Sequence, residues 1–261
     1  MKPAAFDYAR AASLAEATRL LQEGGAEARP IAGGQSLGPM LNLRLAQPKL
    51  LVDVTGIPEL SGAAQRADAV VIGAAVTHAA IEDRRVPDIG QDVLTRVAEG
   101  IAYRAVRNRG TIGGSLSHAD PAADWLTALT ALGATVVVQG VSGARTLAMT
   151  GFVTGPFMTA LVSGEIVRSI QIPRLSGGAR WGWYKVCRKP GEFASTIAAV
   201  LVDPARAVRR AAIGATGDKP LALEGEDVSE ETLARRLAAI DPIERRVHCV
   251  ALRRALTQVT A

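Results

Sequence analysis

The sequence predicts an α+β protein whose chain divides into more than one compact unit. A short amphipathic helix and two strands open the chain, and three consecutive strands followed by two helices close it. Runs of strands followed by runs of helices are typical of α+β folds. A chain of 261 residues is also longer than a usual single domain.

The opening segment is predicted from its capping and breaking residues. Ser13-Leu14-Ala15-Glu16 is a capping box, and the apolar helix that follows is stopped by Gly24-Gly25. Apolar runs at 29–32 and 50–54 predict two strands. We expect a small α/β unit that ends near Pro58.

The rest of the chain is predicted in two parts. Strands are expected at 69–75, 134–139 and 165–172, and helices around 92–102 and from Asp120-Pro121 lie between the first two strands. After Ser176-Gly177-Gly178 we expect strands at 180–188, 197–202 and 209–214 and helices at 230–240 and 242–259. The expected domains are therefore 1–176, with subdomains of about 1–58 and 59–176, and 177–261.

The distribution of apolar and charged residues predicts the cellular location of the protein. No apolar run approaches the ~20 residues of a membrane span. Asp7, Arg10 and Glu16 interrupt the region where a signal peptide would be apolar. We expect a cytoplasmic protein without a transmembrane segment.

The net charge of +5 makes an anionic ligand or partner plausible on electrostatic grounds. The densest basic pairs lie on the predicted C-terminal helices without interleaved aromatic residues: Arg235-Arg236, Arg245-Arg246 and Arg253-Arg254. This pattern favours solvated helix faces over a nucleic-acid site. No nucleic-acid partner is expected.

The cysteines and histidines predict no metal site. Cys187 and Cys249 lie far apart, and His78, His118 and His248 show no metal-ligand spacing. A disulfide framework, a zinc site and a protein-held iron–sulfur cluster are therefore disfavoured. Redox chemistry would need an organic cofactor or another chain.

The candidate ligand-binding residues lie mainly in two glycine turns. The first, Ala32-Gly33-Gly34-Gln35-Ser36-Leu37, follows a predicted strand. Its glycines allow positive φ and a close approach of a ligand, so successive N–H groups could bind an anion such as a pyrophosphate. A plain tight turn is the alternative, and the pattern is not the GxGxxG of a Rossmann site.

The second turn runs from Arg107 to Leu116 and contains Thr111-Ile112-Gly113-Gly114-Ser115, which we interpret as a second anion-binding turn. Two carboxylates follow it. Asp120 could cap a helix begun by Pro121 or could contact a ligand. Asp124 lies too far along to cap that helix, so it could accept a hydrogen bond from a ring N–H or a ribose hydroxyl. His118 is interpreted as a polar loop residue.

Together the turns resemble a known family. The pattern AGGQSL, then Arg44, then VRNRGTIGGSL and ADPAAD is similar to the FAD-binding medium chain of the molybdenum hydroxylases, which include xanthine dehydrogenase and aerobic carbon monoxide dehydrogenase. The resemblance extends through Glu165-Ile166-Val167 and Trp183-Tyr184-Lys185 to Phe193-Ala194, nearly the whole chain. It implies a vanillyl-alcohol-oxidase-like (PCMH-type) FAD-binding fold of two subdomains plus a C-terminal α+β domain.

The resemblance also implies roles for individual residues. Residues 32–37 would wrap the FAD pyrophosphate, residues 111–115 would hold the flavin-proximal part, and Lys185 would lie near the isoalloxazine. Trp183 or Tyr184 would either lie against the ring or serve in sheet packing. The implied cofactor-binding set is Ala32, Gly33, Gly34, Gln35, Ser36, Leu37, Ile101, Thr111, Ile112, Gly113, Gly114, Ser115, His118, Asp120, Asp124, Val167, Trp183, Tyr184 and Lys185.

The implied function is electron transfer through non-covalently bound FAD. A small partner subunit would carry two [2Fe–2S] clusters and a large one the molybdenum cofactor, in a dimer of heterotrimers. Electrons would leave FAD to a quinone, NAD or oxygen. One alternative is a stand-alone FAD-dependent oxidoreductase. A remote one is a serine hydrolase, because Gly34-Gln35-Ser36-Leu37-Gly38 satisfies GxSxG.

Overall fold

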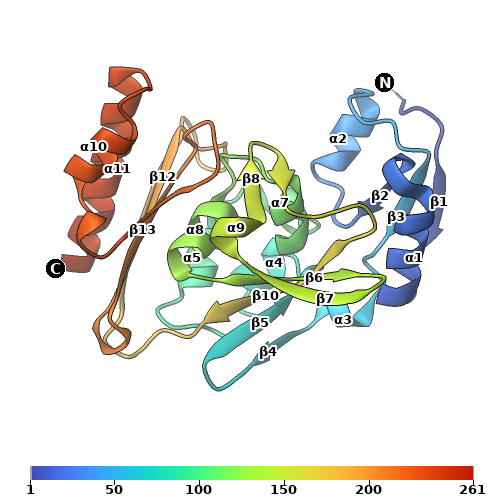
Figure 1. Cartoon of the computed structure of the whole chain (residues 1–261), viewed down its shortest axis with the longest axis horizontal. Helices are drawn as coiled ribbons and strands as arrows, with labels where there is room; N and C mark the ends of the chain where they lie inside the picture. Colours follow the sequence, from blue (N-terminus) through green and yellow to red (C-terminus); the bar gives the residue numbers. More distant parts are fainter. Residues whose placement is uncertain (1, 261) are drawn as a thin grey trace.

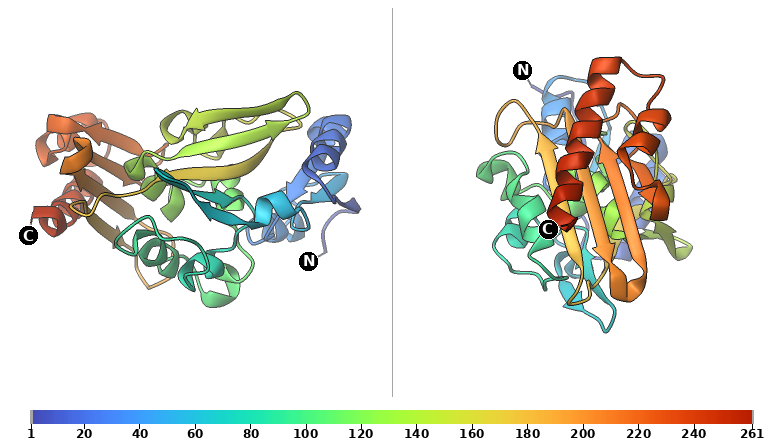
Figure 2. Two further views of the ribbon diagram at one scale, coloured as in Figure 1. Left: turned by 90° about the horizontal axis from the view of Figure 1, so that it is seen from below. Right: turned by 90° about the vertical axis from the view of Figure 1, so that its left-hand side faces the viewer.

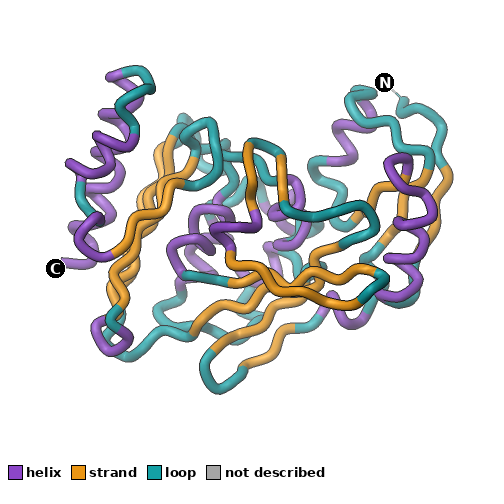
Figure 3. The backbone as a smooth tube through the Cα atoms, viewed as in Figure 1, coloured by secondary structure: helices purple, strands orange, loops and turns teal. Residues whose placement is uncertain are grey.

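A computed structural model describes residues 2–260, which form three main β-sheets and a two-stranded hairpin. In Figure 1 the sheets succeed one another from the blue N-terminal part at the right to the red C-terminal part at the left. Figure 3 shows that helices accompany each sheet. This mixture of helices and separate sheets is the α+β architecture that the sequence predicts.

The first sheet is small and parallel. Its strand order is β1-β3-β2, so the last strand in sequence lies in the middle. Parallel strands require crossover connections, and α1 and α2 lie in these connections. The elements are β1 (Asp7–Arg10), α1 (Leu14–Gly24), η1 (Gly25–Glu27), β2 (Ala28–Ile31), α2 (Leu37–Asn42) and β3 (Leu50–Asp53).

Helix α1 begins where the capping box predicts. The Ser13 hydroxyl accepts a hydrogen bond from the Glu16 amide at 3.2 Å. The Glu16 carboxylate accepts from the amide of Ala12 at 2.8 Å rather than from that of Ser13. The first contact satisfies an N–H group that the start of the helix leaves free, and the second ties the preceding residue to the first turn.

The second sheet is antiparallel, with strand order β4-β5-β10-β6-β7. Its central strand β10 comes last in sequence and is fully buried at Ile170 and Ile172. The strands are β4 (Ala63–Gln65), β5 (Ala69–Gly73), β6 (Thr135–Gly140), β7 (Gly143–Ala148) and β10 (Ile166–Pro173), with the hairpin β8 (Val153–Gly155) and β9 (Met158–Thr159) beside them.

Short helices surround this sheet, and one of them is enclosed. All nine residues of α8 are buried, because α8 packs against β10 on one side and against β12 and β13 of the third sheet on the other. The helices are α3 (Pro58–Ser61), α4 (His78–Glu82), α5 (Val93–Glu99), α6 (Arg104–Arg107), α7 (Ile112–His118), α8 (Asp124–Leu132) and α9 (Met149–Phe152).

The third sheet is an antiparallel meander, β11-β12-β13-β14. Figure 2 shows the long helix α11 lying across its outer face. The elements are β11 (Arg180–Val186), β12 (Thr196–Asp203), η2 (Pro204–Arg206), β13 (Val208–Gly214), β14 (Leu221–Glu224), η3 (Gly225–Asp227), α10 (Glu230–Arg236) and α11 (Pro242–Thr260).

The two faces of the third sheet belong to different cores. Ala199 and Leu201 face the large core shared with α8 and the second sheet. Ala198 and Val200 face a smaller core made with α10 and α11. Because strand residues alternate between faces, β12 links both cores. The C-terminal sheet is therefore packed against the rest of the chain through buried apolar side chains.

The predicted boundaries fall between elements. Residues 176 and 177 lie in the connection from β10 to β11, and residue 58 begins α3, after the first sheet ends. The division into domains remains a proposal. Between residues 2 and 260, none of the helices combines the length and apolar character that crossing a bilayer would require.

Several elements differ from the prediction. The helix expected from Asp120-Pro121 begins at Asp124, the predicted helices at 92–102 and 230–240 are shorter, and the first strand of the third sheet ends at Val186. Strands β1 and β7 are largely exposed, so they carry no apolar run that would reveal them. The short strands β4 and β14 were also missed.

Candidate functional site

The first glycine turn leads from β2 into α2. Gly34 has φ +69°, a left-handed conformation that favours glycine. The backbone carbonyl of Gly34 accepts from the amide of Gly38 at 2.9 Å, while the side chain of Gln35 donates to the Gly33 carbonyl at 3.3 Å. Among residues 2–260, no protein group accepts a hydrogen bond from the amides of Gly33 to Leu37. Five successive donors are thus open to a ligand.

This turn lies against the backbone that leads into the second one. A Cβ atom added at Gly33 would lie 2.0 Å from the carbonyl oxygen of Arg109 and 2.8 Å from the Cα of Gly110. Only glycine permits such an approach of two backbones. The structure therefore brings the two glycine segments together, although 77 positions separate Gly33 from Gly110.

The second turn uses its amides differently. The amides of Ile112 and Gly113 donate to the carbonyls of Val76 and Ala74 at 3.0 and 2.9 Å. The amide of Gly114 donates to the Thr111 hydroxyl at 3.1 Å, so Thr111 is the N-cap of α7. These donors already have partners, and the interpretation of this turn as a second open anion-binding turn is wrong.

The glycine pair here has a packing role. A Cβ at Gly113 would lie 2.4 Å from the Cβ of Ala74. The amide of Ser115 donates to the carbonyl of Thr111 at 3.0 Å, which continues the first turn of α7. The segment 111–115 can therefore offer a cofactor its side chains and its surface, but not the amides of residues 112–115.

Asp120 lies beyond α7, whereas His118 is the last residue of that helix and not the loop residue that the sequence predicts. The Asp120 carboxylate accepts from the amide of Ala122 at 2.9 Å in a local turn, and the N-cap of α8 is Ala123. The prediction that Asp120 caps a helix starting at Pro121 is therefore wrong, because the helix begins three residues later. The ring of His118 lies 5.2 Å from that of Phe157, centroid to centroid.

Asp124 and Lys185 form a buried ion pair between α8 and β11. Their side chains are 8% and 10% exposed, and Nζ lies 2.9 Å from both carboxylate oxygens. The hydrogen bond runs to Oδ2, so Oδ1 is buried without a hydrogen-bond partner among the described residues. Burial raises the pKa of Asp124 to about 6, although the charge of Lys185 opposes the shift.

The aromatic residues of β11 divide between its two faces. Trp183 packs on the large core, on the same face as Lys185, and its ring is stacked with Trp181 at 6.2 Å. Tyr184 packs on the C-terminal core, where the guanidinium of Arg254 lies 4.9 Å from its ring centroid. The alternative in which Tyr184 lies against a cofactor near Lys185 is therefore wrong, and of the two candidates Trp183 is the one on that face.

Ile101 and Val167 complete the predicted set. Ile101 is partly buried and follows Gly100, whose carbonyl accepts from Lys185 Nζ at 3.0 Å. Val167 is 4% exposed and precedes a register shift in the pairing of β10 with β6. Ile101 is thus adjacent in sequence to the Asp124–Lys185 pair, and Val167 is a core residue of the central strand.

His78 is a residue at this site that sequence reasoning missed. Its Nδ1 accepts from the indole N–H of Trp125 at 3.1 Å, and its backbone amide donates to the Gly110 carbonyl at 2.9 Å. Burial lowers the pKa of His78 to about 4, so the ring is neutral near pH 7. No spacing in the sequence links it to Trp125, 47 positions away.

The geometry does not support a nucleophilic serine. Ser36 has φ −102° and ψ −51°, an unstrained backbone, whereas a nucleophile elbow holds its serine on a sharp, strained turn. Within residues 2–260, no histidine hydrogen-bonds to Ser36: His78 accepts from Trp125, and His248 lies 2.6 Å from the Thr196 hydroxyl. The hydrolase alternative lacks its general base.

Comparison with known proteins identifies related chains. Residues 4–175 match the family described as the FAD-binding domain in molybdopterin dehydrogenase. The chain is 35% identical to the 6-hydroxypseudooxynicotine dehydrogenase complex subunit alpha of Paenarthrobacter nicotinovorans, over 92% of this chain and 82% of the relative. It is 37% identical to the carbon monoxide dehydrogenase medium chain of Hydrogenophaga pseudoflava, over 87% and 79% of the two chains.

The solved structures include a chain of similar shape. A chain of the Hydrogenophaga pseudoflava carbon monoxide dehydrogenase that lacks the Mo-pyranopterin moiety superposes with a TM-score of 0.90. The two chains are 32% identical, and the match covers 100% of this chain and 99% of the other. The similarity therefore includes all three sheets.

Proposed function

Because this chain belongs to the family of FAD-binding subunits of molybdenum hydroxylases, we propose that it is the electron-transfer subunit of such an enzyme. It receives electrons from the [2Fe–2S] clusters of a small partner subunit, holds them on FAD and passes them to an external acceptor. The large partner carries the molybdenum cofactor, and the complex is a dimer of heterotrimers in the cytoplasm. The chain itself is an oxidoreductase flavoprotein subunit.

The open first turn is the observation that carries the proposal. A diphosphate needs several N–H donors, and Gly33 to Leu37 offer five successive amides without a protein partner. The left-handed φ of Gly34 favours a residue without a side chain, so no Cβ covers the middle of this turn. The residues present therefore fit the pyrophosphate of FAD.

A second fit lies at Asp124. Its Oδ1 is buried and makes an ion pair with Lys185 Nζ at 2.9 Å, but it accepts no well-aligned hydrogen bond among the described residues and can therefore accept one from a ligand. A ring N–H or a ribose hydroxyl of FAD would satisfy it. Lys185, 2.9 Å away, holds a positive charge at the same place, which favours negative charge on a neighbouring group.

We assign each part of the chain a task in binding. The amides of the first turn bind the pyrophosphate, and the segment 111–115 forms the wall beside it. Asp124 accepts a hydrogen bond at Oδ1, Lys185 supplies the cation, and Ile101, Val167 and Trp183 provide apolar surface. When bound, FAD supplies the redox chemistry that these side chains lack.

The division of labour between subunits is supported by the relatives themselves. Their names give carbon monoxide and 6-hydroxypseudooxynicotine, two chemically unrelated substrates, yet this chain is about equally similar to both. A subunit that bound the substrate would be expected to differ between such enzymes. We therefore place substrate chemistry on the large subunit.

The cofactor content tests the first half of the proposal. Expressed alone, the full chain should retain FAD, contain neither iron nor molybdenum and oxidise no aldehyde or N-heterocycle. Acid precipitation should release all of the flavin, since neither glycine turn contains a histidine or cysteine. Flavin kept in the pellet would contradict non-covalent binding, and a protein that binds no FAD would contradict the proposal.

Co-expression with the neighbouring genes tests the second half. The chain should co-elute with a small iron–sulfur subunit and a large molybdenum subunit, and substrate should bleach the flavin of the complex. A lone flavoprotein that turns over a substrate by itself would instead establish the stand-alone oxidoreductase.

A further inference from the structure

The segment Gly100–Ala102 turns three successive backbone carbonyls toward buried cations. The Gly100 carbonyl accepts from Lys185 Nζ at 3.0 Å. The carbonyls of Ile101 and Ala102 both accept from Nη1 of Arg107, at 2.9 and 3.0 Å. Lys185 belongs to the third sheet and Arg107 to α6, so the two cations reach this segment from different parts of the fold.

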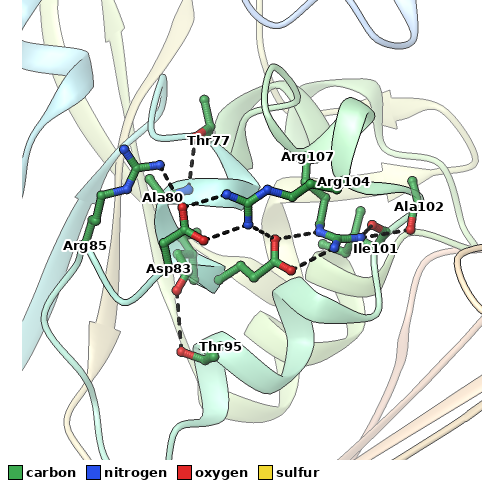
Figure 4. Close-up of polar contacts among 11 residues, drawn as sticks. Thr77, Ala80, Asp83, Arg85, Thr95, Ile101, Ala102, Arg104 and Arg107 are labelled. Carbon is green, nitrogen blue, oxygen red and sulfur yellow. Dashed lines mark hydrogen bonds and ion pairs between the residues drawn. The ribbon is translucent and has the colours of Figure 1, made fainter.

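Each cation is fixed in turn by a carboxylate. Glu82 binds Arg107 with both oxygens, at 2.8 Å from Nε and 2.7 Å from Nη2. Figure 4 shows Arg107 with its hydrogen bonds to Ile101 and Ala102. Asp124 binds Lys185 at 2.9 Å. Arg107 is only 11% exposed, so its four hydrogen bonds lie in a poorly hydrated environment where they are stronger than at the surface.

The conformation of the segment depends on these contacts. Ala102 has φ +43°, which an L-residue other than glycine seldom adopts. A Cβ at Gly191 would lie 2.6 Å from the Ala102 carbonyl oxygen, so the neighbouring loop is packed closely on it. Without Arg107, two inward carbonyls would lose their donors, and the strained backbone would lose the contacts that hold it.

We propose that Arg107, held by Glu82, is a positioning residue that fixes the segment 100–102 and thereby the FAD-facing position of Ile101. The inference rests on the proposed function, which assigns Ile101 and the Asp124–Lys185 pair to the cofactor site. Hydrogen bonds to Glu82, Ile101 and Ala102 engage four of the five N–H groups of Arg107. Its effect on the flavin would therefore run through the segment 100–102.

Arginine is required here by geometry as well as by charge. Its fork binds one carboxylate and two carbonyls at once, whereas a lysine has a single nitrogen on a flexible stem. Arg107→Lys keeps the charge and loses this arrangement. It separates the positioning role from a general electrostatic one.

Arg104 is the matched control. It binds Glu82 at 2.6 Å and Asp83 at 2.7 Å in the same cluster, but no hydrogen bond joins it to the segment 100–102 among the described residues. Its side chain is 45% exposed. Arg104→Ala removes exposed ion pairs with Glu82 and Asp83, which contribute little to the free energy of folding. It leaves the hydrogen bonds from Arg107 to the carbonyls of Ile101 and Ala102 in place.

The experiment compares the full-length chain with its Arg107→Lys, Arg107→Met and Arg104→Ala variants. FAD is titrated into each apoprotein, and the visible circular dichroism and midpoint potential of the bound flavin are recorded. We expect both Arg107 variants to raise the Kd for FAD at least about tenfold and to change the dichroism and the potential. Arg104→Ala should stay within about twofold of the unchanged chain in Kd.

The outcomes separate this inference from the proposed function. If the unchanged chain binds no FAD, the proposed function fails. If it binds FAD and Arg107→Lys keeps the same Kd, dichroism and potential, the positioning role alone is overturned. Equal shifts in the Arg104 and Arg107 variants would also overturn it, since they would indicate general loosening of the cluster. If Arg107→Met does not fold, the result for Arg107→Lys decides.

Discussion

The two glycine turns have nearly the same letters, Gly-Gly-Gln-Ser-Leu and Gly-Gly-Ser-Leu, yet they use their backbones in opposite ways. The first leaves five amides open, and the second hydrogen-bonds its amides within the protein. Part of the difference comes from the segment after β5, where the carbonyls of Val76 and Ala74 accept from Ile112 and Gly113. Another part lies three residues before the second glycine of each pair. Thr111 stands there in the second turn and caps Gly114, whereas Ile31 in the first turn has no side-chain acceptor. A glycine pair can bind a ligand through its backbone N–H groups only where these groups do not already donate hydrogen bonds to the protein.

The largest effect should come from Gly34→Val in the open turn. A β-branched residue at φ +69° costs at least ~1–2 kcal/mol, and displacing two amide–phosphate bonds costs roughly 1.5–3 kcal/mol each. We expect the Kd for FAD to rise at least about 100-fold while the apoprotein still folds.

Gly38→Ala is the control for that variant, because a Cβ at Gly38 meets no atom within 4 Å. It should leave FAD binding within about twofold. Fluorescence titration measures both variants. Unchanged FAD affinity in Gly34→Val would show that this turn is not the pyrophosphate site.

The second-largest effect is a pH dependence of stability caused by Asp124, which follows the second turn. Its folded pKa of about 6 exceeds the ordinary 3.8, so the folded chain binds more protons than the unfolded chain between these values. The resulting stabilisation is present below about pH 4 and is lost as the pH rises to about 6. The difference between these two pKa values corresponds to on the order of 2–3 kcal/mol.

Asp124→Asn isolates this contribution. The difference in free energy of unfolding between the unchanged apoprotein and this variant should fall as the pH rises from about 4 to 6, measured by urea denaturation. His78, whose pKa is lowered to about 4, acts in the opposite direction in both proteins and cancels in the difference. A difference that is independent of pH, or that grows with pH, would rule out a raised pKa.

In the second turn, Gly113→Ala should affect stability rather than binding. The added Cβ would lie 2.4 Å from the Cβ of Ala74, and such overpacking costs about 1–3 kcal/mol. Urea unfolding of the apoprotein should show this loss, and the Kd for FAD should rise less than in Gly34→Val. If Gly113→Ala abolished FAD binding without lowering the free energy of unfolding, the packing role assigned to Gly113 would be contradicted.

The smallest effect should come from Thr111→Ala, which removes the cap of α7. Loss of a threonine N-cap costs about 1 kcal/mol, and Thr111→Ser should restore most of it. Equal stability of the alanine and serine variants in urea would mean that the hydroxyl does not cap Gly114.

Much of the fold was predictable, and the family resemblance is confirmed by the match over residues 4–175. The predicted PCMH-type α+β fold is confirmed by the structural similarity to carbon monoxide dehydrogenase. The sequence pattern located β5, β6, β10 and the strands β11, β12 and β13 of the meander, because buried strands leave a clear pattern. The exposed edge strand β7 left none, and the central place of β10 depends on pairings far apart in sequence.

The candidate site was predictable in its parts and not in its contacts. The glycines, Asp124 and Lys185 were singled out, but nothing in the sequence pairs Asp124 with Lys185 or brings Gly33 against Arg109. Tyr184 and Lys185 are consecutive residues of a strand, so their side chains point to opposite faces and cannot both contact one ligand there. One part of the difference between the turns is visible in the sequence as Thr111, but its capping role depends on a helix that the sequence did not predict. The other part, the pairing of Ile112 and Gly113 with Val76 and Ala74, depends on tertiary contacts.

Hydrogen–deuterium exchange of the full chain, with and without saturating FAD, tests the central claim most directly. The account predicts that FAD slows exchange of the amides of Gly33 to Leu37, which have no protein partner in the described structure. The amides of residues 112–115 should exchange slowly in both states, because they already donate to protein groups. Unchanged exchange in the first turn at full FAD occupancy, with new protection confined to residues 112–115, would contradict it.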